Sequence, residues 1–79
     1  MNKKTTSVEI KSEFITLGQF IKYVDIIQSG GEAKAYLKSA HVLVNGDEDN
    51  RRGRKLRNDD LVEIEGKFYK IIQKWLSVS

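Results

Sequence analysis

Residues 29–46 read SGGEAKAYLKSAHVLVNG, and this stretch decides which fold the sequence predicts. Ser29 and Glu32 fit the S-x-x-E pattern of a helix start, and the two glycines between them allow a sharp turn. Apolar residues then recur at helical spacing, at Ala33, Tyr36, Leu37 and Ala40. Residues 41–44 form a β-type run, and the Asn45-Gly46 pair that follows favours the positive φ angles of a tight hairpin turn. The stretch therefore predicts a short helix that leads into a strand.

A second helix is predicted upstream. One helical face collects the apolar residues Leu17, Phe20, Ile21, Val24 and Ile27. Thr16 and Gln19 fit a T-x-x-Q capping box, in which each side chain binds a backbone N–H of the other residue. The pattern predicts a helix that begins after Thr16 and ends near Gln28.

Three further segments have the pattern of strands. Val8 and Ile10 alternate with charged neighbours, which indicates a half-buried edge strand. Two β-type runs, residues 61–65 and 68–72, follow the charged middle of the chain. The sequence thus predicts a mixture of helices and strands.

The chain has 79 residues, which is enough for one small domain with one core. Residues 1–6 are predicted to be a disordered polar tail and residues 7–79 a single domain, with Trp75 and Leu76 closing the core. There is no cysteine, and no apolar run approaches the ~18 residues of a membrane span. We expect a cytoplasmic protein without a membrane segment.

The residues needed for common enzymes and metal sites are missing. The chain has one histidine, His41, no serine in a nucleophile-elbow context and no glycine-rich nucleotide loop. Asn45, Asp47 and Asp49 match the first three side-chain ligands of a calcium-binding EF-hand loop, but Asn50 and Leu56 stand where glycine and glutamate are required. We therefore expect no enzyme activity, no metal and no cofactor.

The strongest functional signal is residues 51–57, RRGRKLR, here called the basic segment, which places five cations in seven residues. Arginine binds phosphate through two parallel hydrogen bonds, and neutralised phosphates release counterions, so the segment favours contact with a phosphate backbone. A solvated loop, partly neutralised by neighbouring acids, is the alternative. The role of the acids 47–49 is left open. The predicted phosphate contacts are Arg51, Arg52, Arg54, Lys55 and Arg57.

Other groups are predicted to support this surface. Lys34 and Lys38 lie one turn apart on the exposed side of the second predicted helix, and Lys22 lies on the first. Gly30 could hold a phosphate on free backbone N–H groups, or it could serve only as a turn residue beside the capping Glu32. Aromatic residues suited to base stacking are sparse near the cations, so we predict recognition of RNA shape and backbone rather than of bases.

In order and spacing, these motifs resemble the S4 RNA-binding domain. The resemblance covers about residues 16–65, in the segments LGQFIK (17–22), SGGEAK (29–34), HVLVNG (41–46) and DLVEI (60–64). It implies an α+β fold in which two short helices pack against a small, mostly antiparallel sheet, as in the small stand-alone bacterial members. It also implies RNA binding by the helices and the adjoining loop, with Lys34, Lys38 and His41 on the RNA-facing side.

Two motifs depart from the family. Members often begin the first helix with Arg-Leu-Asp-Lys, where this chain has TLGQ at residues 16–19, and often have Ser-Arg-Ser, where it has SGG at residues 29–31. The cations of the basic segment are expected to replace those that are missing. We therefore expect a monomer that binds structured RNA, ribosomal or other. The rival hypothesis is an adaptor that docks an acidic protein partner, ribosomal or other, and DNA stays open because phosphate contacts do not identify the sugar.

Overall fold

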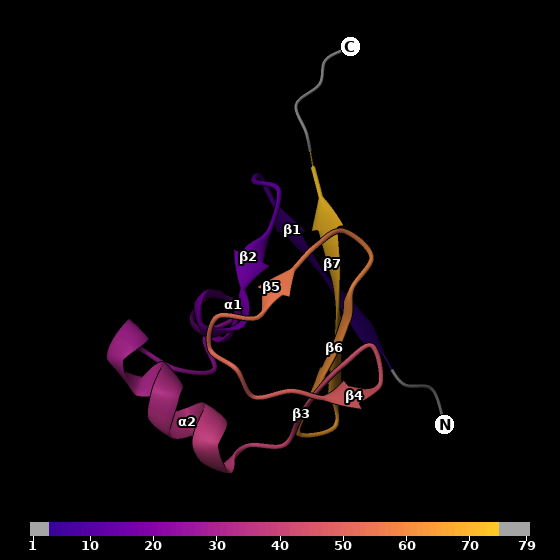
Figure 1. Cartoon of the computed structure of the whole chain (residues 1–79). Coiled ribbons are helices and arrows are strands. Elements are labelled where there is room, and N and C mark those ends of the chain that lie inside the picture. Colours follow the sequence, from indigo (N-terminus) through magenta and orange to yellow (C-terminus); the bar gives the residue numbers. More distant parts are fainter. Residues whose placement is uncertain (1–3, 75–79) are drawn as a thin grey trace.

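A five-stranded sheet forms one side of the molecule (Figure 1). The computed structural model describes residues 4–74, so the predicted roles of Trp75 and Leu76 lie outside the described residues. The strand order is β1-β7-β6-β3-β4, in which β1 and β7 are parallel and the other pairs antiparallel. The strands are β1 (Thr5–Ile10), β3 (Val42–Val44), β4 (Asp47–Glu48), β6 (Leu61–Ile64) and β7 (Lys67–Gln73).

Two short helices lie together beside this sheet (Figure 1). They are α1 (Leu17–Tyr23) and α2 (Ala33–Ser39), and a 3₁₀ turn, η1 (Gly30–Glu32), leads into α2. A small second sheet pairs β2 (Ile15–Thr16) with β5 (Lys55–Leu56) in antiparallel fashion. The predicted α+β fold, with two helices against a mostly antiparallel sheet, is confirmed.

The predictions of an edge strand and of a tight turn at Asn45-Gly46 are confirmed. Val8 and Ile10 are buried in β1, which is an edge strand as predicted. Thr5 and Thr6, which were placed in the disordered tail, belong to β1, because the strand pairs with β7 over its whole length. Asn45 has φ 54° and Gly46 has φ 88°, so this pair makes the predicted tight turn, here between β3 and β4.

The core lies between the sheet and the helices. Leu17, Phe20 and Ile21 of α1 are fully buried, and the ring of Phe20 meets that of Tyr69 edge to face, with ring centroids 5.3 Å apart. Leu56, the next-to-last residue of the basic segment, is also fully buried. A residue of the charged segment therefore belongs to the core.

Helix α1 is shorter than the apolar pattern predicted. It ends at Tyr23 rather than near Gln28, because Asp25 takes a left-handed conformation with φ 62°. The N–H of Ile26 then donates to the carbonyl oxygen of Ile21 at 2.9 Å, a bond that closes the helix end. Ile27 is still buried, so periodicity identified a core residue correctly but assigned it to the wrong kind of backbone.

The two predicted capping boxes have different outcomes. The box at Thr16 and Gln19 is present, with both reciprocal hydrogen bonds formed. The box at Ser29 is not, because the 3₁₀ turn separates Ser29 from α2. The Glu32 carboxylate instead accepts from the backbone N–H of Gln28 at 2.8 Å. Glu32 therefore stabilises the backbone that precedes the 3₁₀ turn and does not cap α2 with its side chain.

Candidate nucleic-acid interface

Backbone hydrogen bonds join the basic segment to the start of helix α1. The N–H of Leu17 donates to the carbonyl oxygen of Arg54 at 2.7 Å, and the N–H of Gly18 donates to that of Arg52 at 2.9 Å. These N–H groups lie in the first turn of α1 and have no partner within the helix. With the β2–β5 pairing and buried Leu56, they hold the backbone of the basic segment in place.

Gly18 permits this close approach. A Cβ atom on Gly18 would lie 2.6 Å from Cγ of Arg52 and 3.3 Å from the Arg52 carbonyl oxygen. A larger residue at this position would require the Arg52 side chain to move and its carbonyl oxygen to shift by a few tenths of an ångström. The glycine thus gives a structural reason for the departure from the family pattern, in which an aspartate often follows the leucine.

Asp49 binds two arginines of the basic segment. Its Oδ2 accepts from Nη2 of Arg51 at 2.9 Å and from Nη1 of Arg54 at 3.3 Å, and its Oδ1 accepts from the backbone N–H and Nε of Arg51. The Asp49 side chain is only 10% exposed, whereas that of Arg51 is 69% exposed. Hydrogen bonds from Arg51 lower the pKa of Asp49 to about 2, against a smaller opposing effect of burial. Asp49 therefore orients part of the basic segment, a role that the sequence left open.

Replacing Asp49 with asparagine should remove a pH-dependent part of the stability. Because the pKa of Asp49 is about 2 when folded and 3.8 when unpaired, its stabilisation is complete above pH ~4 and is lost as the pH falls towards 2. We expect Asp49→Asn to lower the free energy of unfolding by about 1–2 kcal/mol at pH 7, a value reduced to allow for the exposed Arg51. Urea unfolding at pH 7 and pH 2.5 measures the difference.

The exposed neighbour Asp47 provides the matched control, and Asp47→Asn should change stability little at either pH. A gap between wild type and Asp49→Asn that stayed constant from pH 7 to pH 2.5 would contradict this role of Asp49.

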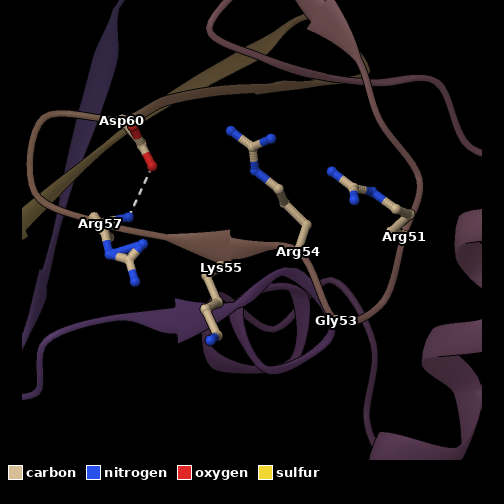
Figure 2. A pocket seen from close by; sticks show the side chains of 6 residues that line it. All are labelled: Arg51, Gly53, Arg54, Lys55, Arg57 and Asp60. Atoms are coloured by element: carbon tan, nitrogen blue, oxygen red, sulfur yellow. Dashed lines mark hydrogen bonds between the residues drawn. The ribbon is translucent and has the colours of Figure 1, made fainter.

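Four of the five cations of the basic segment form two groups on opposite sides of β5 (Figure 2), and the fifth, Arg52, is exposed beside Gly18. Arg51 and Arg54 form one group, around Asp49. Lys55 and Arg57 form the other, and both approach the ring of Phe14, with Lys55 Nζ 4.9 Å and Arg57 Cζ 5.6 Å from its centroid. The basic segment therefore presents cations on two faces, one organised by Asp49 and the other by Phe14.

Phe14 was missed by the sequence analysis, which found few aromatic residues near the cations. The β2–β5 register explains its position: Ile15 pairs with Leu56, so the preceding Phe14 falls beside Arg57. Only the pairing of two short strands far apart in the sequence could have revealed this neighbour.

An open hollow of about 500 Å³ lies along the basic segment, lined by Arg51, Gly53, Arg54, Lys55, Arg57 and Asp60 (Figure 2). Asp60 lines this hollow, and its Oδ2 accepts from the backbone N–H of Arg57 at 2.8 Å. Its other oxygen accepts from the amide of Asn45 at 3.0 Å. The acids that flank the basic segment thus shape its backbone.

The remaining predicted residues lie on other elements. Lys22 is exposed on α1, Lys34 and Lys38 are exposed on α2, and Gly30 is exposed in η1. The fifth, His41, lies 3.3 Å from the Glu48 carboxylate, measured from Nδ1. Among residues 4–74, no hydrogen bond or ion pair joins any of these residues to the basic segment. The predicted residues 51–57 thus form one continuous segment, to which the other predicted residues are not joined by any described hydrogen bond or ion pair.

The described part of the chain has neither a cluster of metal-ligating side chains nor a helix that could span a membrane. Residues 4–74 contain no group of three or more His, Cys, Asp or Glu residues that could hold a metal ion. None of the helices described there is long and apolar enough to cross a membrane.

Comparison with known proteins gives two matches. A family model described as the S4 domain matches residues 8–72, which include the basic segment. The chain is also similar to the probable ribosome maturation protein RlbA of Bacillus subtilis (strain 168). The two sequences are 61% identical over 59 residues, which cover 75% of this chain and 83% of the relative.

Proposed function

Because this chain belongs to the S4 domain family, we propose that it is a cytoplasmic, non-enzymatic protein that binds structured RNA through phosphate contacts of the basic segment. The name of its Bacillus relative refers to ribosome maturation, which makes ribosomal RNA the proposed target. Arg51, Arg52, Arg54, Lys55 and Arg57 are the primary contacts in this proposal.

The fixed backbone of the basic segment is the observation that carries the proposal. A cationic loop that is already ordered loses less conformational entropy when it binds than a free loop does. The hydrogen bonds from Leu17 and Gly18, together with the buried Leu56, provide this order. The cations are thus attached to a backbone that is already ordered before RNA binds.

Asp49 does not remove the positive character of this surface. Arg51 uses Nε and Nη2 to bind Asp49, but a guanidinium has five N–H donors, and the Arg51 side chain is 69% exposed. One carboxylate also cannot neutralise both Arg51 and Arg54. The pair can therefore bind a phosphate while Asp49 holds the planar groups in place.

Supporting contacts are proposed on the helices. Lys22 on α1 and Lys34 and Lys38 on α2 are exposed cations, and Gly30 and His41 lie at the two ends of the segment that contains α2. An RNA that contacted them together with the basic segment would have to extend over both helices. These residues are therefore secondary in the proposal.

Salt dependence tests the proposal. If three to five phosphates are neutralised, the logarithm of the RNA affinity should fall with the logarithm of the salt concentration at a slope of roughly −2 to −4. Fluorescence anisotropy with a structured ribosomal RNA fragment measures this slope, and a DNA duplex of the same sequence tests whether the ribose matters.

A flat salt response would rule out phosphate contacts as the source of affinity. Failure to bind any RNA at low salt would instead favour the adaptor hypothesis. Protein purified without nuclease gives a simple first check, because bound RNA adds absorbance at 260 nm that high salt should remove.

A further inference from the structure

Tyr23, at the end of helix α1, presents an aromatic ring to solvent. It is 59% exposed, which is the largest exposure among the large hydrophobic residues that the structure describes. Its hydroxyl donates to the carbonyl oxygen of Glu9 at 3.2 Å. The hydrogen bond joins the end of α1 to β1 and restricts the ring, so the exposed surface is held in one orientation.

Tyr23 borders a surface hollow of about 440 Å³, here called the aromatic hollow, which is lined by Ser12, Phe14, Ile15, Gln19, Lys22 and Tyr23. The apolar part comes from Phe14, Ile15 and the Tyr23 ring, and Lys22 adds a cation. Gln19 uses its Oε1 in the capping box, where it accepts from the N–H of Thr16. Its amide N–H donors therefore remain for a ligand.

The aromatic hollow and the basic segment meet at Phe14. The same Phe14 ring that lines the hollow lies 4.9 Å from Lys55 Nζ and 5.6 Å from Arg57 Cζ. An aromatic surface is thus bordered by cations from two separate parts of the chain. A nucleotide combines a flat ring with an anionic phosphate, so it matches both halves of this surface.

We propose that the aromatic hollow binds one unpaired base of the RNA. Tyr23 provides the stacking surface, and Gln19 and Lys22 donate hydrogen bonds to the edge of the base. Phe14, whose ring face is approached by Lys55 and Arg57, places these two cations beside the hollow. Lys55 and Arg57 bind the adjoining phosphate. This proposal rests on the proposed RNA-binding function and adds that the preferred RNA carries an unpaired nucleotide beside a helix.

Two RNA hairpins that differ only by one bulged adenosine test this. We expect the wild-type protein to bind the bulged hairpin about five- to 150-fold more tightly, the range that corresponds to stacking of one base. Tyr23→Ala should abolish this preference and leave the affinity for the paired hairpin unchanged. Tyr23→Phe keeps the ring and should keep most of the preference.

Leu61→Ala is the matched control, because Leu61 is also an exposed large hydrophobic residue but lies in β6, and it should alter neither affinity. Fluorescence of 2-aminopurine at the bulge gives an independent readout: stacking on an aromatic ring should quench it with wild type and not with Tyr23→Ala.

Two results would overturn the assignment of the hollow and leave the proposed function standing. One is equal, salt-dependent binding of both hairpins by the wild-type protein. The other is a Tyr23→Ala variant that binds both hairpins more weakly by the same factor. Absence of salt-dependent binding to either hairpin would overturn the proposed function, and this proposal with it.

Discussion

Leu56→Ala should lower the free energy of unfolding by about 2–5 kcal/mol, the usual range for removing a fully buried leucine side chain. Leu56 has no exposed surface and is the basic segment's contribution to the core. A small domain is stabilised by only about 5–15 kcal/mol in total, so the variant should unfold at a markedly lower temperature than wild type.

The Leu56→Ala substitution should also destabilise the backbone of the basic segment. Leu56 pairs with Ile15 in the small sheet, and the N–H groups of Leu17 and Gly18 bind carbonyl oxygens of the same segment. Amide hydrogen exchange at Leu17 and Gly18 should therefore be much faster in Leu56→Ala than in wild type.

Urea unfolding compares this variant with Leu61→Ala, which removes the same atoms from an exposed site and should cost less than about 1 kcal/mol. Equal stability of the two variants would show that Leu56 does not anchor the basic segment.

The double variant Lys55→Glu and Arg57→Glu should bind structured RNA about 100-fold more weakly at moderate salt, with a salt slope that is smaller by about two. Both side chains are exposed, and their described contact is with the ring of Phe14, so the fold should persist. Arg54 is less suitable for this test, because a glutamate there would lie beside the largely enclosed Asp49 carboxylate and disturb the segment itself.

The matched control reverses two lysines elsewhere on the sheet. Lys67 begins β7, and Lys4 directly precedes Thr5, which pairs with Phe68, so the two lysines are near neighbours. Lys4→Glu and Lys67→Glu changes the net charge by the same amount and should weaken binding less than about threefold, because salt screens distant charges. Equal losses in the two double variants would mean that only net charge matters.

Local sequence signals predicted the parts of the fold that depend on near neighbours. The capping box at Thr16 and the turn at Asn45-Gly46 each involve residues at most three apart, and both are present. The alternation of Val8 and Ile10 correctly gave an edge strand. The predicted end of α1 was wrong, because the apolar spacing continues through Ile27 whereas the backbone leaves the helix at Asp25.

The candidate site was less predictable, because it depends on contacts between distant segments. The charge density of the basic segment was evident, but its support comes from two-residue strands, which are too short to show periodicity. The neighbours Phe14 and Gly18 could not be assigned without that pairing. Asp49 was equally hidden, since its role is set by the geometry of two arginines rather than by a motif.

The position of β7 in the sheet limits when this domain can fold during its synthesis. β7 lies between β1 and β6, although it is the last strand of the described chain. The first strand therefore has no partner until residues 67–73 have left the ribosome, and its pairing must close a loop that spans nearly the whole chain. The helices and the β3–β4 hairpin can form from earlier segments, but β1 can pair only once residues 67–73 are available.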